Sequence, residues 1–489
     1  MADPHGFLDH PARELPERRP VPVRILDHRE ISLPQDRAQL QRQASRCMDC
    51  GIPFCHQGCP LGNLIPEWND LARRGELRAA SERLHATNNF PELTGRLCPA
   101  PCESSCVLGI SQPAVTIKRI EQSIADAALE GEWLEPRPPE RLTGRTVAVV
   151  GSGPAGLAAA QQLVRAGHTV AVFERDDRIG GLLRYGIPDF KLDKQVLEQR
   201  LAQLRAEGVR FRPGVEIGRD LGWDELRRRY DAIVIATGAP VARPLGVPGE
   251  HLDGVVDAMP YLVAQNRRNA GDEVVGAPDA AGRHVIVIGG GDTGADCIGT
   301  AHRQGAASVT SLAIGRRPPQ ERPADQPWPT VPRLYEVQTS HEEGGERRYE
   351  AATVELVGDA DGRVVGLRVA DTEFGADGRR GPKVGTERVL PADLVLNATG
   401  FAGAQAGALE AQLGLARGRR GALARDARFA TAVDGVFVAG DAGRGASLVV
   451  WAIAEGRAAA AAVDRYLLGG TRLPAPVTTV DAPFAVPRA

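Results

Sequence analysis

Apolar residues recur at intervals of three and four positions between residues 35 and 130, as in "IPEWNDLARRGELRAASERLHA" and "VTIKRIEQSIADAALEG". This spacing places apolar side chains on one face of a helix. The pattern therefore predicts a helical region, with its cysteines in the loops that the helices hold together. The proline-rich stretch "LEPRPPERLTGR", residues 134–145, interrupts this pattern and predicts a linker.

After residue 145 the pattern changes to short β-branched runs, glycine turns and alanine-rich helices. The segment "TVAVVGSGPAGLAAAQQLVRAGHTVAVFER" predicts strand, turn, helix and strand, and "RHVIVIGGGDTGADCIGTAHRQGAASVTSLAIGRR" at 283–317 repeats the design. Such βαβ units are typical of dinucleotide-binding folds. We therefore expect an α/β protein in which a helical domain precedes two Rossmann-like domains, each with its own nucleotide.

Later segments indicate how the two nucleotide domains divide the chain. Two strand endings are alike, "YDAIVIATGA" at 230–239 and "ADLVLNATGF" at 392–401, and "GVFVAGDAGRGASLVVWAIAEG" follows near the C-terminus. We expect the second ATG ending and the GD segment to complete the first nucleotide domain. Residues 341–390 alternate like antiparallel strands of the second, inserted domain. The predicted boundaries are 1–140 for the helical domain, 141–255 and 395–489 for the first nucleotide domain, and 256–394 for the second.

The chain has 489 residues, a length typical of about three domains. Its 59 basic and 62 acidic residues give a net charge of −3, so no overall basic field would attract nucleic acid or an anionic membrane. The N-terminal segment lacks the apolar core of a signal peptide, and no apolar run is long enough to span a bilayer. We expect a cytoplasmic protein, in which clustered thiols serve as metal ligands or redox groups rather than structural disulfides.

The first glycine-rich loop, "VVGSGPAG", has the spacing of a dinucleotide site. Gly151 permits the tight turn, Gly153 lets backbone amides approach a pyrophosphate, and Gly156 lets helix and strand pack closely. The phosphates would lie at the helix N-terminus. Glu174 ends the next strand, where a carboxylate can accept hydrogen bonds from both hydroxyls of an adenosine ribose. This arrangement suits FAD or NAD.

The second loop carries Gly289, Gly291 and Gly294 at the same spacing, but its next strand leads to Arg316 and Arg317 instead of a carboxylate. Two guanidinium groups offer bidentate donors to a 2′-phosphate, so we expect NADP(H) here. The alternative is that the arginines belong to a solvated loop.

Seven of the eight cysteines precede the first nucleotide domain, with the spacing C-x2-C-x4-C-x3-C-P and then C-P-x2-C-x3-C. They are Cys47, Cys50, Cys55, Cys59, Cys98, Cys102 and Cys106. Bacterial ferredoxins use closely spaced cysteines that end in Cys-Pro, and the last one ligates the other of two clusters. Beside two nucleotide sites, the spacing favours iron–sulfur clusters with crossed ligation.

Two other interpretations of the thiols stay open. Four thiolates satisfy a structural zinc ion, although the spacings are irregular for a zinc ribbon and seven thiols leave a second all-thiolate site one ligand short. The "CMDC" pair could be a redox disulfide, but such a motif normally lies beside the flavin within its fold. The eighth cysteine, Cys297, is best explained as a small buried hydrophobic residue.

Several longer motifs resemble one known family. They are "CMDCGIPFCHQGCPLGNLIPEWNDL", "GRLCPAPCESSCVLGI", "VTIKRIE", "GSGPAGLAAA", "GGLLRYGIPDFKLDK", "GGGDTGADC", "SHEEG" and "VFVAGDAGRGASLVVWAIAEG". Together they resemble the small (β) subunit of NADPH-dependent glutamate synthase over nearly the whole chain, and also the N-terminal half of dihydropyrimidine dehydrogenases.

The resemblance implies FAD in the first nucleotide domain, NADPH in the inserted one and two [4Fe–4S] clusters in the helical domain. One cluster would be held by Cys47, Cys50, Cys55 and Cys106. The other would be held by Cys59, Cys98 and Cys102, with Glu121 as the eighth ligand. The alternative for Glu121 is an exposed helical glutamate.

The same resemblance implies the FAD contacts, which are Gly151, Gly153, Pro154, Ala155, Gly156, Glu174, Gly181, Leu182, Gly440 and Asp441. The contacts predicted for NADPH at the second loop are Gly289, Gly291, Asp292, Thr293, Gly294, Arg316 and Arg317. Asp441 would bond the ribityl chain, and a helix starting near Ser447 would direct its N-terminus at the isoalloxazine. The unfamiliar loop "RPPQERPADQPWPTVP" leaves the NADPH contacts around 315–333 open.

The implied activity is oxidation of NADPH at FAD and passage of single electrons through the clusters to a large (α) subunit, which forms glutamate from glutamine and 2-oxoglutarate. Hydride transfer needs alignment and exclusion of water, so no catalytic acid or base is expected. The chain would then work in a hetero-oligomer. The alternatives are a stand-alone NADPH:acceptor oxidoreductase, the donor subunit of another reductase, or a zinc-containing assembly subunit without catalysis.

Overall fold

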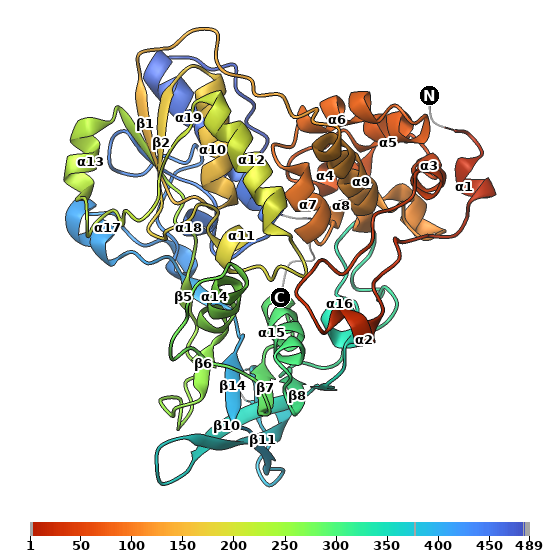
Figure 1. The fold of residues 1–489 in the computed structure, drawn as a ribbon, viewed down its shortest axis with the longest axis vertical. Helices are drawn as coiled ribbons and strands as arrows, with labels where there is room; N and C mark the ends of the chain where they lie inside the picture. The colour runs from red at the N-terminus through yellow and green to blue at the C-terminus, as the bar shows by residue number, and fades with distance from the viewer. Residues whose placement is uncertain (1–2, 376–377, 483, 485–489) are drawn as a thin grey trace.

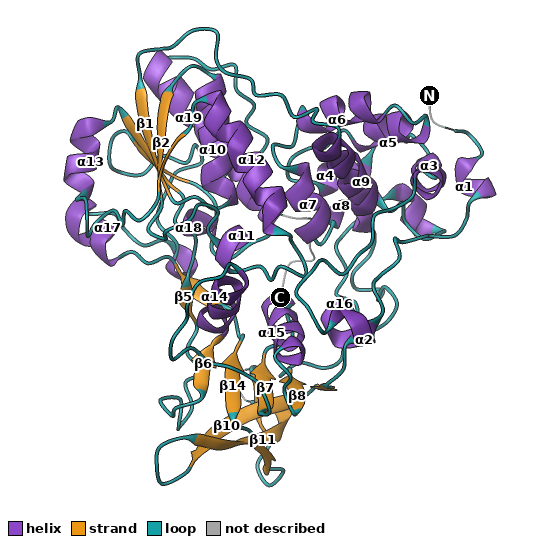
Figure 2. Cartoon of the chain, in the orientation of Figure 1, coloured by secondary structure: helices purple, strands orange, loops and turns teal. Residues whose placement is uncertain are grey.

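The computed structural model describes residues 3–375, 378–482 and 484. The chain forms an N-terminal group of helices and two α/β parts, each built on a parallel sheet (Figures 1 and 2). The helical part lies beside the first α/β part, and the second α/β part lies at the other end of the long axis (Figure 1). Among the described residues, no helix is long and apolar enough to cross a membrane.

The N-terminal part is helical because its apolar periodicity is that of amphipathic helices, as predicted. Its longest helix, α9 (Ile117–Glu130), packs against α7 (Pro91–Leu97). The other elements are α1 (Gly6–Asp9), α2 (Val21–Arg24), α3 (Arg37–Ser45), α4 (Phe54–Gly58), α5 (Ile65–Arg73), α6 (Leu77–His85), α8 (Pro101–Ser104) and the 3-10 helix η1 (Val107–Ile110). The prediction that every cysteine lies in a loop is wrong for Cys55 and Cys102, which lie in the short helices α4 and α8.

The first α/β part contains a five-stranded parallel sheet in the order β16-β4-β1-β2-β3. The strands are β1 (Thr146–Val150), β2 (Thr169–Phe173), β3 (Arg210–Arg212), β4 (Ala232–Ile235) and β16 (Val436–Val438). The helices are α10 (Pro154–Arg165), α11 (Leu182–Tyr185), α12 (Lys194–Glu207), α13 (Trp223–Arg229), α17 (Gly407–Leu413), α18 (Asp441–Arg444) and α19 (Val449–Leu468). The predicted return of the GD segment to this domain is confirmed, because β16 pairs with β4.

Helices α10 and α19 pack together at unusually short range because both are rich in small residues. A Cβ added at Gly456 of α19 would lie 2.3 Å from the carbonyl oxygen of Ala155 on α10. No larger side chain fits this crossing. The alanine-rich sequence of α19 therefore sets the position of its N-terminus relative to the first glycine loop.

The second α/β part contains a parallel sheet in the order β6-β14-β7-β8-β9 and a separate antiparallel sheet. The parallel strands are β6 (Val255–Asp257), β7 (His284–Ile288), β8 (Ser308–Leu312), β9 (Glu346–Arg348) and β14 (Leu394–Asn397), and the helices are α14 (Ala258–Asn269), α15 (Asp292–Arg303) and α16 (Thr339–Glu342). The antiparallel strands are β10 (Ala351–Gly358), β11 (Val364–Phe374), β12 (Arg380–Pro382) and β13 (Arg388–Pro391). The antiparallel pattern predicted within 341–390 is confirmed.

The prediction that the second ATG ending completes the first nucleotide domain is wrong for β14, the strand that leads into this ending. Strand β14 pairs with β6 and β7 of the second sheet. A Cβ added at Gly289 would lie 2.2 Å from the carbonyl oxygen of Ala398, just as one at Gly151 would lie 2.4 Å from that of Ala236. Each ATG ending therefore packs against the glycine loop of its own domain. After β14 the chain crosses back toward the first α/β part. Strand β15 (Phe401–Gly403) pairs there with β5 (Val241–Ala242), and the 3-10 helix η2 (Arg419–Gly421) follows.

The N-terminal segment also contacts the second α/β part. Arg24 on α2 donates from Nε to Oε1 of Glu343 at 2.8 Å, and both side chains are buried. Glu343 accepts a second guanidinium from Arg303 of α15, with Nη1 to Oε2 at 2.6 Å. These bonds hold the helical part and the second α/β part together.

Candidate functional site

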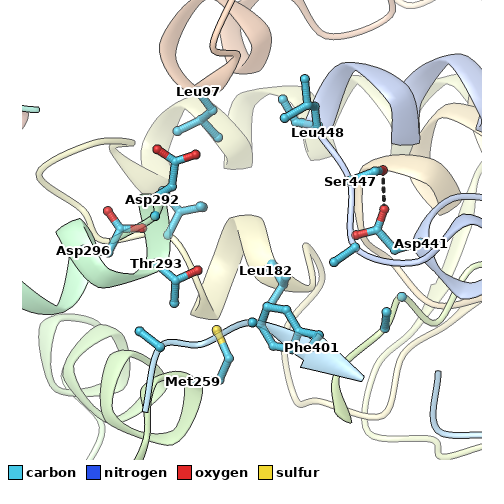
Figure 3. A pocket seen from close by; sticks show the side chains of 18 of the residues that line it. Leu97, Leu182, Met259, Asp292, Thr293, Asp296, Phe401, Asp441, Ser447 and Leu448 are labelled. Carbon is cyan, nitrogen blue, oxygen red and sulfur yellow. Dashed lines mark hydrogen bonds between the residues drawn. The ribbon is translucent and has the colours of Figure 1, made fainter. Parts of the chain in front are cut away.

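A cavity of about 2540 Å³ lies where the three parts meet. Both glycine loops line it, together with the N-terminal residues of α19 and residues of the helical part next to the cysteines. Figure 3 shows Leu97, Asp292 and Leu448, which come from these three parts of the chain, directed toward this space. Its volume is several times that of a site for one drug-sized ligand, so two dinucleotides can share it.

The first glycine loop has the local geometry of a phosphate cradle. Gly151 has a φ of 103°, and a Cβ added at Gly156 would lie 2.0 Å from the Gly151 carbonyl oxygen. By contrast, a Cβ at Gly153 would meet no atom within 4 Å. Gly153 therefore faces open space at the N-terminus of α10, where Pro154 and Ala155 also line the cavity.

Glu174 follows the end of β2, and hydrogen bonds from Ser152 and Asp176 fix its carboxylate. Its Oε2 accepts from the amide and the hydroxyl of Ser152, at 3.0 and 2.6 Å, and its Oε1 accepts from the amide of Asp176 at 3.0 Å. The side chain is buried but still lines the cavity. Its position fits the predicted ribose contact, which stays a prediction.

The Gly181 and Leu182 turn approaches the first glycine loop from another side. Gly181 has a φ of 52°, and a Cβ there would lie 3.1 Å from the Cα of Gly153. Leu182 directs its side chain into the cavity (Figure 3). The two residues thus border the same space as the phosphate cradle.

Gly440 and Asp441 lie at the junction of β16 and α18. A Cβ added at Gly440, whose φ is 67°, would lie 2.7 Å from the Cβ of Ala155, and its amide donates to the fully buried Glu455 at 2.8 Å. Burial raises the pKa of Asp441 to about 6, although its carboxylate accepts from the Ser447 hydroxyl at 2.6 Å (Figure 3). Helix α19 begins at Val449, two residues after the predicted start, and its first residue lines the cavity.

The second glycine loop repeats the geometry of the first. A Cβ at Gly294 would lie 2.5 Å from the Gly289 carbonyl oxygen, whereas Gly291 faces open space at the N-terminus of α15. Asp292 and Thr293 follow directly and line the cavity (Figure 3). Asp292 accepts from Nε2 of Gln338 at 2.5 Å. The repeated cradle fits a second dinucleotide.

The arginines after β8 belong to a larger cationic and aromatic group. Arg316 lines the cavity and donates from Nε to Oε1 of Glu350 at 3.3 Å. The guanidinium carbon of Arg317 lies 4.0 Å from the ring centroid of Tyr335. Arg333 and Arg347 also line the cavity, and the latter lies 4.9 Å from the same ring. The sequence did not indicate Arg333 or Arg347, since both are separated from the strand by segments without a recognisable pattern. The positive charge fits a 2′-phosphate.

Four of the seven clustered cysteines face one small cavity. We call Cys47, Cys50, Cys55 and Cys106 the Cys47 group. Burial raises the pKa of Cys47 to about 12, and the Cys106 and Cys50 thiols add to the rise. Burial also raises the pKa of Cys55, and the other three thiols contribute. The four cysteines therefore line one common space.

The other three cysteines and Glu121 form a second buried group, the Cys59 group. Burial raises the pKa of Cys59 to about 11 and that of Cys98 to about 12, and Glu121 adds to both rises. Cys59, Cys98 and Glu121 likewise add to the rise that burial causes in Cys102. The structure thus places the Cys47 group around one cavity, whereas the division of the ligands between two clusters stays a prediction.

Glu121 is a buried residue of α9, so the alternative of an exposed helical glutamate is wrong. Its Oε1 accepts from Nδ2 of Asn88 at 2.9 Å and from the hydroxyl of Thr94 at 2.5 Å. Burial raises the pKa of Glu121 to about 7. The carboxylate is thus fixed inside the helical domain, and its role as a ligand stays a prediction.

The ligand number of each group suits a [4Fe–4S] cluster, in which each of the four iron atoms takes one protein ligand. Zinc, which takes four ligands at a single ion, stays an alternative by ligand number alone. Cys297 is fully buried in the core of the second α/β part, as predicted.

Two dinucleotide folds that open into one cavity, next to a cysteine-rich helical domain, define a flavoprotein-type oxidoreductase. A family described as pyridine nucleotide-disulphide oxidoreductases matches residues 145–456. A second family, described as dihydropyrimidine dehydrogenase domain II with a 4Fe-4S cluster, matches residues 24–133. The structure of Mycobacterium tuberculosis FprA in complex with NADPH is similar in fold, with a TM-score of 0.53 and 22% identity, and covers 66% of this chain and 84% of that one. The predicted fold class is confirmed.

Relatives that match the whole chain specify the family further. The glutamate synthase [NADPH] small chain of Mycobacterium tuberculosis is 59% identical, over 99% of this chain and 100% of its own length. That of Bacillus subtilis is 46% identical over 97% and 100%, and that of Escherichia coli is 38% identical over 92% and 96%. The chain belongs to the family of glutamate synthase NADPH small chains, and the predicted resemblance is confirmed.

Proposed function

We propose that the chain is the NADPH-oxidising small subunit of a glutamate synthase. It would supply electrons to a large subunit that forms glutamate from glutamine and 2-oxoglutarate. The proposal rests on the shared cavity, which both glycine loops and the segment next to Cys98 line. The chain therefore has the parts of an electron donor in one continuous arrangement.

FAD, when bound, accepts a hydride from NADPH and releases electrons singly, which iron–sulfur clusters carry onward. We assign FAD to the first loop, where Gly153 and the α10 N-terminus receive the pyrophosphate and Glu174 bonds the ribose. Asp441, held by Ser447, orients the ribityl chain. The N-terminus of α19 places its partial positive charge beside the isoalloxazine.

NADPH occupies the second loop in this proposal. The open space at Gly291 receives its pyrophosphate, and Asp292 and Thr293 border the path toward the flavin. Arg316 and Arg317 bind the 2′-phosphate, with Arg333 beside them. No side chain needs to act as an acid or base, because the protein contributes alignment and exclusion of water.

The two cysteine groups hold two [4Fe–4S] clusters, which we name the inner and the outer cluster. The Cys59 group would hold the inner one, because Leu97, the neighbour of Cys98, lines the dinucleotide cavity. The Cys47 group would hold the outer one, because Cys47, Cys50 and Cys55 are only partly buried. Electrons would leave from the outer cluster to the large subunit.

We propose the same division of the chain that the sequence indicates: clusters in 1–140, FAD in 141–255 and 395–489, and NADPH in 256–394. Strand β14 is the exception, because it pairs within the NADPH domain. A cytoplasmic location and a hetero-oligomer with the large subunit belong to the same proposal.

Co-purification with a large subunit tests the function. The isolated chain, prepared anaerobically with flavin and iron, should reduce artificial acceptors with NADPH but form no glutamate. Addition of the large subunit should give glutamine-dependent glutamate formation. Glutamate made without a partner, or flavin that NADPH does not bleach, would contradict the proposal. Acceptor reduction without any binding to a large subunit would favour the stand-alone oxidoreductase.

A further inference from the structure

Asn69 is a polar side chain in an apolar part of the helical domain. It lies on α5, its exposed fraction is 0%, and Ile65 and Pro66 on the preceding turn are also buried. In the part of the chain that the structure describes, neither Nδ2 nor Oδ1 of Asn69 has a hydrogen-bond partner. A buried amide without a partner is costly, so its presence points to a group that binds in the adjoining space.

The side chain of Asn69 faces the Cys47 group. Asn69, Ile65 and Pro66 line the small cavity into which the four thiols of this group open. The unpartnered amide therefore borders the space that a cluster held by these thiols would occupy.

We propose that Asn69 is a positioning residue for the outer cluster: when the cluster is bound, the Nδ2–H of Asn69 donates to one of its sulfur atoms and raises the reduction potential of the cluster. The inference rests on the proposed two-cluster assignment. Hydrogen bonds to cluster sulfurs are one of the means by which a protein sets the potential. Reduction adds one electron and therefore negative charge, so a donor directed at the sulfur stabilises the reduced state more than the oxidised one.

The expected size of the effect follows from the strength of one such bond. A hydrogen bond to a charged acceptor shifts an equilibrium by about tenfold. For a one-electron couple, tenfold corresponds to about 59 mV. A higher potential at the outer cluster would draw electrons away from the flavin and toward the exit of the chain.

The test is an anaerobic redox titration of the complete cluster-containing chain, followed by electron paramagnetic resonance. Asn69→Leu keeps a similar volume but has no donor. We expect the potential of one cluster to fall by about 59 mV, with the other potential, the iron content and the sulfide content unchanged. Ser81→Ala on α6 is a matched control, because Ser81 is buried in the same domain and bonds His85 instead of a cysteine. Full iron content with both potentials unchanged would overturn the proposal.

A measurement on the wild-type side chain keeps the proposal testable if Asn69→Leu loses iron. In protein labelled with 15N-asparagine, pulsed electron paramagnetic resonance of the reduced chain should detect a 15N nucleus coupled to the outer cluster. The absence of any such coupling would refute the hydrogen bond. Wild-type protein without iron and sulfide would instead refute the two-cluster assignment, so the two failures are distinguishable.

Discussion

A buried ion pair joins the helical domain to the first α/β part, and its removal has an effect that the structure allows us to estimate. Arg200 on α12 donates from Nε and Nη2 to the two carboxylate oxygens of Glu92 on α7, at 2.8 and 2.7 Å. Their side chains are 1% and 0% exposed. Glu92→Ala would leave the guanidinium buried without its bidentate partner.

Removal of one partner of a buried pair costs about 3–5 kcal/mol. Arg200 would keep two weaker contacts, with Oε1 of Gln203 at 2.5 Å and Nε2 of His85 at 3.1 Å. We therefore expect the lower end of the range, about 3 kcal/mol, or a factor of roughly 150 in the equilibrium between the closed and the opened interface.

Native-state hydrogen exchange of the α7 and α12 amides measures this opening, because the exchange of a protected amide follows the population of its open form. In Glu92→Ala these amides should exchange on the order of a hundred times faster than in wild type. Asp220→Ala, which breaks an exposed pair with Arg219, should change little. The double variant Glu92→Leu with Arg200→Met should recover much of the loss, since no buried charge remains. If Glu92→Ala behaves like Asp220→Ala, the estimate is refuted.

Four further predictions test other parts of the molecule. Gly156→Ala should yield protein without flavin absorbance, because the new Cβ would lie 2.0 Å from a backbone carbonyl oxygen. Arg316→Ala with Arg317→Ala should lower the ratio of NADPH to NADH turnover by about tenfold or more, and an unchanged ratio would exclude the 2′-phosphate contact. Glu121→Ala should lose about half of the iron, since one of two clusters would lack a ligand; unchanged iron would exclude ligation. Burial lowers the pKa of His85 to about 4, so the unfolded chain binds a proton below pH 6.5 that the folded chain excludes. The contribution of His85 to stability should therefore fall by up to about 3 kcal/mol between pH 6.5 and 4 in thermal unfolding, and His85→Gln should reduce the slope by that share, while His341, whose pKa burial also lowers to about 4, keeps its own.

Local patterns in the sequence were sufficient for the class of the fold and for much of the candidate site. The apolar periodicity of 35–130 predicted the helical domain, and two glycine loops between apolar strands predicted two Rossmann-like folds. These features can be predicted because each depends on residues within about thirty positions of one another. The irregular thiol spacing likewise favoured clusters over zinc without any knowledge of the fold.

Tertiary packing decided which distant segments meet. Strand β14 begins with three apolar residues and could complete either sheet, and its pairing with β6 and β7 assigned it to the second. The burial of Glu121, the approach of Arg333 to the second dinucleotide site and the position of Asn69 at the cavity of the Cys47 group also depend on residues far apart in the chain or on the packing of whole helices. A sequence pattern records the period of each element, whereas the contacts between elements arise from side-chain shape and buried volume, which only the folded chain defines.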